Sequence, residues 1–91
     1  MKKILVVCSN GLGSSLMLKS AIQRACDEHD IDATVEHCDL GSAHSMAPGH
    51  DLIVTSEALA DELEGLDVPI ATIVNFTSQQ EIKDKVISQL Q

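Results

Sequence analysis

The stretch that decides the fold spans residues 4–15 and reads Ile4-Leu5-Val6-Val7-Cys8-Ser9-Asn10-Gly11-Leu12-Gly13-Ser14-Ser15. Its first four residues are apolar and mostly β-branched, which predicts a buried strand that ends at Cys8. The two glycines allow a tight loop whose backbone N–H groups converge on an anion. The helix expected next adds its unpaired N–H groups and the positive end of its dipole. The stretch therefore predicts a thiol beside a phosphate-binding loop.

Cys8 is the candidate nucleophile of this arrangement. The N–H donors that hold a phosphate would also favour a thiolate, so we expect a lowered pKa and a reactive sulfur. The alternative is an inert core cysteine at a strand end. Ser14 and Ser15 are either helix caps or direct phosphate contacts. The candidate phosphate-binding residues are Ser9, Asn10, Gly11, Leu12, Gly13, Ser14 and Ser15.

Strands and helices alternate along the rest of the chain. Helical spacing of apolar residues predicts a first helix over 14–29, and capping signals predict others over 57–64 and from Ser78 onward. The segment 41–49 reads as a loop or a weak short helix. Apolar or alternating segments predict further strands over 33–38, 51–55 and 70–74.

This alternation predicts an α/β fold with an open, four-stranded parallel sheet and helices on both faces. The alternating segment 33–38 suits an edge strand, which gives the strand order 2-1-3-4. The switch point then lies at the carboxyl ends of the first and third strands, where Cys8 lies. Thr55, Ser56, Asn75 and Thr77 are expected at the same rim. With 91 residues and no linker-like segment, we expect a single domain, 1–91.

Composition excludes several functions. Six Lys and Arg against fourteen Asp and Glu give a net charge of −8, which disfavours nucleic-acid binding. The N-terminal apolar run is too short for a signal peptide or a membrane span, so we expect a soluble protein without direct membrane insertion. Three cysteines without CxxC spacing suit reduced thiols and a cytoplasmic location. One aromatic residue, Phe76, is too few for a sugar cradle, so another chain must bind most of any sugar.

Other ligand motifs are incomplete. The third glycine of a dinucleotide fingerprint would fall at Leu16, and no lysine lies between Cys8 and Met17 to complete a Walker loop. His37, Cys38, His44 and His50 match no common zinc spacing, and solvated histidines are the default interpretation. We expect neither a cofactor nor a metal.

The spacing from Cys8 to Ser14 invites comparison with low-molecular-weight tyrosine phosphatases, to whose Rossmann-like plan the expected fold is similar. Their signature places an arginine where this chain has Ser14, and their leaving-group acid has no counterpart in 75–78. An arginine would clamp the phosphate, and an aspartate would protonate the leaving group and activate water. Without them, a phosphocysteine has little help toward hydrolysis, which suits onward transfer.

The segment 4–19 resembles the enzyme IIB components of the phosphoenolpyruvate-dependent sugar phosphotransferase system. It looks closest to the ascorbate branch, in which a Cys-x-Asn-Gly-x-Gly-Ser-Ser loop enters a helix; the lactose/cellobiose and galactitol branches are similar in plan. The resemblance implies that Cys8 accepts a phosphoryl group from a phosphohistidine on a IIA partner. It also implies transfer to a sugar, ascorbate-like or related, held by a membrane IIC permease.

Two other functions stay open at this point. The same thiol could serve a small cysteine phosphatase or an arsenate reductase. Alternatively, the chain could be a regulatory module that keeps the fold without reacting.

Overall fold

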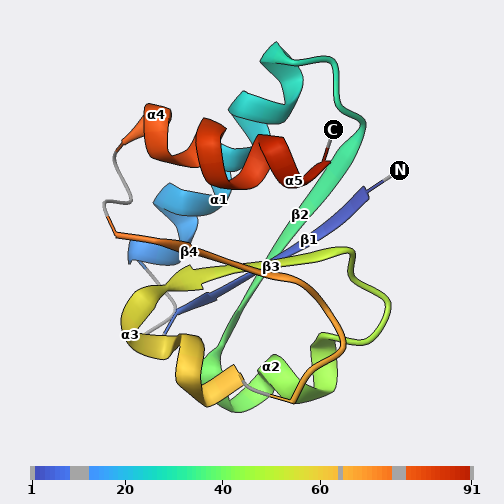
Figure 1. Ribbon diagram of the computed structural model, residues 1–91, viewed down its shortest axis with the longest axis vertical. Helices are drawn as coiled ribbons and strands as arrows, with labels where there is room; N and C mark the ends of the chain where they lie inside the picture. The colour runs from blue at the N-terminus through green and yellow to red at the C-terminus, as the bar shows by residue number, and fades with distance from the viewer. Residues whose placement is uncertain (1, 9–12, 64, 75–77, 91) are drawn as a thin grey trace.

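The computed structural model describes residues 2–8, 13–63, 65–74 and 78–90, without the side chains of Ser14, Ser15 and Ala58. Four parallel strands form its sheet: β1 (Lys2–Cys8), β2 (Ala33–Asp39), β3 (Leu52–Ser56) and β4 (Ile70–Ile73). Their order is β2-β1-β3-β4, as the sequence predicts (Figure 1). The predicted α/β class, edge position of the second strand and switch point between the first and third strands are confirmed.

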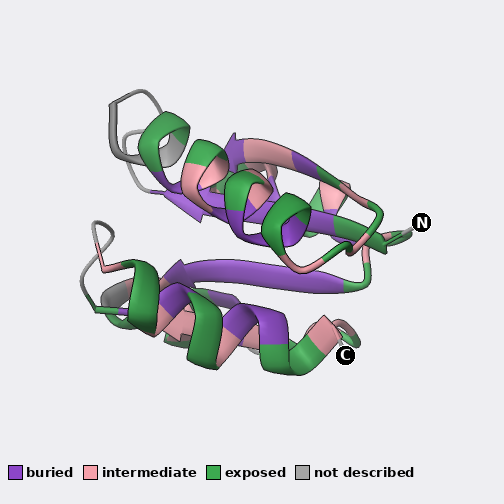
Figure 2. Cartoon of the chain, turned by 90° about the horizontal axis from the view of Figure 1, so that it is seen from above, coloured by how far each residue is buried: buried purple, intermediate pink, exposed green. Residues whose placement is uncertain are grey.

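Helices cover both faces of the sheet (Figures 1 and 2). One face carries α1 (Gly13–Glu28) and the C-terminal helical segment, which comprises α4 (Gln79–Ile82), the π-helical turn η2 (Lys83–Ile87) and α5 (Ser88–Leu90). The opposite face carries α2 (Leu40–Met46), and the short helix α3 (Glu57–Ala60) and 3-10 turn η1 (Asp61–Leu63) complete that side. We call them the large face and the small face.

Alternation along β1 divides the core between these faces. Ile4, Val6 and Cys8 point to the large face, and Leu5 and Val7 point to the small face. All five residues are buried, because a strand in the middle of a parallel sheet is covered on both sides. The apolar side of α1 packs on the large face through four buried residues, Leu18, Ile22, Ala25 and Cys26.

The helix boundaries depart from the sequence prediction in two places. Segment 40–46 forms a helix because the Asp39 carboxylate accepts the Ser42 N–H at 2.8 Å and caps it. Ser56 stands at the N-cap of α3 without a capping hydrogen bond, and the expected single helix over 57–64 is divided into α3 and η1. The predicted cap at Ser78 is confirmed, since its hydroxyl accepts the Glu81 N–H.

Candidate active site

Cys8 is the last residue of β1, at the carboxyl end of a central strand. Its side chain belongs to the core cluster of the large face, and the residue keeps 6% of its surface exposed. The chain then leads to α1, whose backbone begins at Gly13 on that same face. The strand order therefore confirms the predicted position of Cys8 at the switch point of the sheet.

Burial raises the pKa of the Cys8 thiol above its ordinary value. Desolvation disfavours the charged thiolate, because an ionised sulfur loses its hydration when it is covered by apolar side chains. The sequence predicts the opposite direction from the N–H donors of residues 9–12, which lie outside the described residues, so the reactivity of Cys8 stays a prediction.

Thr55 fixes the peptide unit that precedes Cys8. Its buried hydroxyl donates to the Val7 carbonyl oxygen at 2.8 Å, across the β1–β3 pair in which Val7 and Thr55 are register partners. Thr55 is the only polar residue in the buried set of the described chain. The sequence predicts that Thr55 lies at this edge of the sheet. It does not predict the hydrogen bond, which depends on the register between β1 and β3.

Cys38 lies next to Cys8 across the β1–β2 pair but on the other face. The register pairs Val7 with Cys38 and Cys8 with Asp39, and Cys38 packs in the core of the small face. Burial raises the pKa of Cys38, and Asp39, Cys8 and Glu36 raise it further. Because the two side chains point to opposite faces, the pair lacks the geometry of a disulfide, and all three cysteines are free.

The remaining predicted site residues divide into placed and unplaced ones. Gly13, Ser14 and Ser15 form the first backbone turn of α1, and Ser56 ends β3. Ser9, Asn10, Gly11, Leu12, Asn75 and Thr77 lie outside the described residues. Their contribution to a phosphate site stays a prediction.

The histidines and cysteines of the zinc alternative are not gathered into one site. His50 Nε2 lies 3.2 Å from the Glu36 carboxylate, which gives this histidine a partner of its own. Within the described ranges, no group of three His, Cys, Asp or Glu side chains is arranged to hold a metal ion. The structure gives the zinc alternative no support.

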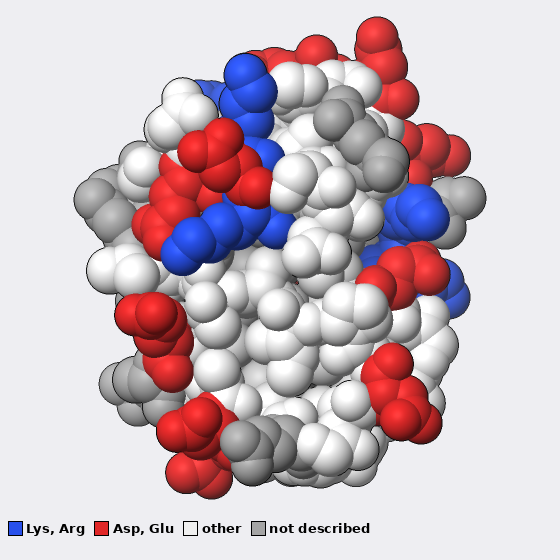
Figure 3. Space-filling model, in the orientation of Figure 1, with Lys and Arg blue, Asp and Glu red and all other residues white. Residues whose placement is uncertain are grey.

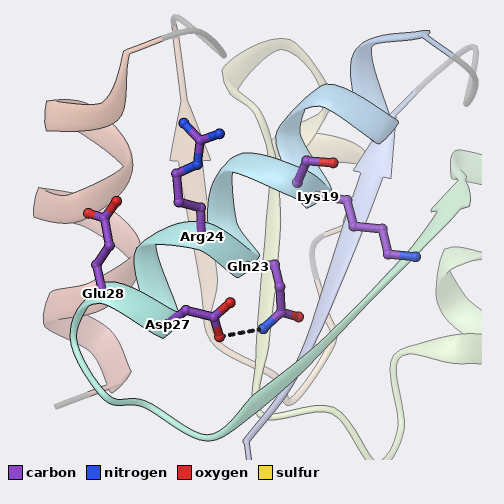
Figure 4. A pocket seen from close by; sticks show the side chains of 6 residues that line it. Lys19, Gln23, Arg24, Asp27 and Glu28 are labelled. Carbon is purple, nitrogen blue, oxygen red and sulfur yellow. Dashed lines mark hydrogen bonds between the residues drawn. The ribbon is translucent and has the colours of Figure 1, made fainter.

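A hollow lies away from Cys8, on the outer side of α1 (Figure 4). It measures about 570 Å³, and the described residues that line it all belong to that helix. Gln23 donates to Asp27 within it at 3.3 Å, and Lys19 extends away from the other labelled groups (Figure 4). Because no described residue of the strand ends lines this hollow, we assign the candidate site to the sheet edge instead. The lining residues are Lys19, Ser20, Gln23, Arg24, Asp27 and Glu28.

Comparison with protein families gives a match along almost the whole chain. Residues 3–88 match the model of the lactose/cellobiose-specific IIB subunit of the sugar phosphotransferase system. The chain belongs to this IIB family. Among the described residues of this IIB chain, no helix is both long and apolar enough to cross a membrane.

Curated relatives with a similar sequence are ascorbate-specific EIIB components. Those of Escherichia coli O157:H7, Shigella flexneri and Salmonella typhi are each 38% identical to this IIB chain over 61 residues. The aligned part covers 67% of this chain, and the chain spans 60% of the length of these relatives.

A solved structure has the same fold. The lactose-specific IIB component domain of Streptococcus pneumoniae superposes on this chain with a TM-score of 0.73. The superposition covers 99% of this chain and 98% of the Streptococcus pneumoniae chain. The two sequences are 18% identical, so this likeness concerns the fold. The predicted family resemblance is confirmed by the family model and the curated relatives together.

Proposed function

We propose that this chain is a IIB phosphocarrier in which Cys8 accepts a phosphoryl group and passes it to a sugar. The observation that carries the proposal is the position of Cys8 at the carboxyl end of β1, with α1 beginning shortly after it. Family membership supports the reaction class. We further propose that residues 1–91 act as one phosphocarrier domain in the cytoplasm, where the three free thiols would stay reduced.

In the first step, the Cys8 sulfur attacks the phosphorus of a phosphohistidine on a IIA donor. The S–P bond forms as the P–N bond breaks, and the thiol proton leaves the sulfur and ends on the released imidazole. Direct attack brings sulfur and imidazole into the same encounter, so the proton can pass between them there. The backbone N–H groups at the start of α1 face the negative charge that spreads over the phosphoryl oxygens.

In the second step, a sugar hydroxyl held by a membrane IIC permease attacks the phosphocysteine. The new O–P bond replaces the S–P bond, and the proton that the hydroxyl loses is balanced by the proton that the released sulfur takes up. The ascorbate-specific relatives favour an ascorbate-like or related sugar, although the matching family model has lactose/cellobiose specificity. Selection of the sugar then belongs to the permease, since this chain has one aromatic residue.

Thr55 supports the proposed chemistry by holding the Val7 carbonyl. This bond fixes the peptide plane between Val7 and Cys8 and so limits the directions that the sulfur can take. In-line displacement needs the attacking atom aligned with the P–N bond, so a fixed direction lowers the entropic part of the barrier. No hydrolysis step is proposed, because Ser14 stands where a phosphatase has its arginine.

The decisive experiment is phosphorylation followed by intact-protein mass spectrometry. The chain is mixed with a histidine-phosphorylated IIA protein, and one added phosphoryl group at Cys8 is expected. Cys8→Ser should accept none, whereas Cys26→Ser, the matched control on the same face, should accept as wild type. Steady release of inorganic phosphate without an acceptor would instead favour the phosphatase alternative, and an unmodified wild-type Cys8 would favour the regulatory module.

A further inference from the structure

Asp39 is the register partner of Cys8 on the neighbouring strand β2. Each of the two residues ends its strand, so both stand at the carboxyl edge of the sheet. Neighbouring strands lie only about 4.8 Å apart, and paired residues direct their side chains to the same face. A carboxylate that followed this rule would lie directly beside the sulfur.

The register pair before this one follows the rule. Val7 and Cys38 are partners, and both are buried in the core of the small face. Alternation then places the next residue of each strand on the large face. Cys8 lies there, as alternation requires, and the same side is expected for Asp39.

The Asp39 carboxylate is bonded on the other side of the sheet. It accepts the Ser42 N–H at 2.8 Å in the first turn of α2, the helix that covers the small face. Burial and then Asp39 raise the pKa of the Cys38 thiol on that face, whereas the raised pKa of Cys8 comes from burial. The capping bond therefore draws the negative charge of Asp39 away from the face that Cys8 occupies.

The sequence around Asp39 supplies no cation to neutralise it. Lys and Arg occur at positions 2, 3, 19, 24, 83 and 85, so residues 25–82 contain none. Among the described residues, Asp39 has no ion-pair partner. On the surface drawn in Figure 3, the part over α2 and α3 shows acidic side chains without Lys or Arg. The capping bond, rather than a neighbouring cation, therefore decides where the charge of Asp39 acts.

We propose that Asp39 is a positioning residue whose bond to the Ser42 N–H keeps a negative charge away from the phosphoryl group on Cys8. The phosphoryl group is itself negatively charged, so a carboxylate beside the sulfur would oppose its arrival and its retention. One side chain thus caps α2 and leaves the large face of the site free of its charge. This inference rests on the proposed function and adds to it a residue that sets the electrostatics at the sulfur.

Three substitutions separate the charge of Asp39 from its cap. Asp39→Asn removes the charge and keeps a side chain that caps well. Asp39→Glu keeps the charge, but its additional methylene group carries the carboxylate past the Ser42 N–H. Asp39→Gln loses the cap in the same way and leaves no charge. The comparison of the Glu and Gln variants therefore isolates the effect of the charge.

The first measurement is phosphoryl acceptance from a histidine-phosphorylated IIA protein that phosphorylates the wild-type chain. Asp39→Glu should lower kcat/KM about tenfold at low salt, which corresponds to about 1.4 kcal/mol. The loss should shrink to about threefold at 0.5 M NaCl, because salt screens the repulsion. Asp39→Asn and Asp39→Gln should stay within about threefold of the wild type, because neither carries the charge.

Two results of this measurement would overturn the proposal. An equal loss in Asp39→Glu and Asp39→Gln would come from the missing cap and not from the charge. A gain of about tenfold in Asp39→Asn would mean that the carboxylate already repels the phosphoryl group from its capped position. Circular dichroism checks the fold of all three variants. Asp39→Asn keeps the capping group, so its result tests the proposal even where the other two variants do not fold.

The second measurement does not depend on phosphoryl transfer. Cys8 is alkylated with iodoacetate, an anion, and with iodoacetamide, its neutral counterpart, and peptide mass spectrometry follows the modification of Cys8. The ratio of the iodoacetate rate to the iodoacetamide rate should fall about fivefold in Asp39→Glu and stay within about twofold in Asp39→Gln. An unchanged ratio in Asp39→Glu would overturn the proposal. If the wild-type chain accepts no phosphoryl group from any IIA donor, the proposed function fails separately, and this ratio still tests where the charge acts.

Discussion

The two faces of the sheet are built from the same four strands, but they bury very different cores. Fifteen buried residues make up the core of the large face, under a first helix of 16 residues. The small face has seven, under a helix of seven residues and two shorter turns. Cys8 points to the large face and Cys38 to the small one. The comparison teaches that the candidate nucleophile lies on the side of the sheet with the larger buried core.

The largest expected effect separates these two thiols chemically. Cys8→Ser should lower phosphoryl acceptance at least about a thousandfold, because a serine hydroxyl is a far weaker nucleophile near neutral pH. Cys38→Ser should leave acceptance within about threefold, since its side chain lies on the opposite face. Rapid-quench measurement of labelled phosphate on the chain checks both variants. Equal losses would show that the face of the sheet does not decide reactivity.

The second prediction compares the packing of the two faces directly. Ile22→Ala on the large face should lower the free energy of unfolding by about 3 to 4 kcal/mol, because it leaves a cavity between α1 and the sheet. Leu63→Ala on the small face should cost about 2 to 3 kcal/mol, since the short turn η1 has more freedom to close the space. Urea unfolding followed by circular dichroism measures both. A larger loss for Leu63→Ala would reverse the ranking of the faces.

The third prediction concerns the bond that reaches from β3 to the residue before Cys8. Thr55→Val removes the donor and leaves the buried Val7 carbonyl without it, which should cost about 1 to 3 kcal/mol. Thr55→Ser keeps a hydroxyl and should recover part of this loss. The rate of phosphoryl transfer to Cys8, measured well below the unfolding temperature, should be lower in Thr55→Val than in the wild type. It should be partly restored in Thr55→Ser. An unchanged rate in folded Thr55→Val would remove the positioning role.

The fourth prediction compares helix caps on the two sides. Ser78→Ala should cost about 1 kcal/mol, because its hydroxyl accepts the Glu81 N–H at 3.1 Å. Ser56→Ala should cost less, because Ser56 makes no capping hydrogen bond. Thermal unfolding of the two variants under the same conditions checks the difference. A greater loss for Ser56→Ala would mean that its hydroxyl has another structural role.

The smallest expected effect is on the pH dependence of stability. The pKa values of Cys8, Cys26 and Cys38 are all raised, with burial as the main cause. A group with a raised pKa in the folded state binds its proton more tightly there, so its contribution is complete below the ordinary thiol pKa. That contribution is lost as pH rises toward the folded value. Stability should therefore decline at alkaline pH, and less so in Cys38→Ala, as urea unfolding between pH 7 and 10 would measure.

The elements could be predicted because their patterns are local. The apolar run 4–7, the helical spacing of Leu18, Ile22 and Cys26, and the cap at Ser78 each depend on neighbouring residues. The sequence leaves segment 41–49 open between a loop and a weak short helix, because the stability of the observed helix α2 comes from one capping carboxylate, Asp39, and from burial of Ala43 on the sheet. Packing against the sheet therefore stabilises this helix beyond what its local helix propensity provides.

The sequence by itself determined the alternation of strands and helices, the strand order and the place of Cys8 at a strand end, because short-range periodicity and the handedness of crossovers govern them. Tertiary structure alone decided that Thr55 meets Val7 and that Cys8 and Cys38 point to opposite faces. It also decided the direction of the Cys8 pKa shift. Register and burial are properties of several segments packed together, and no single segment carries them.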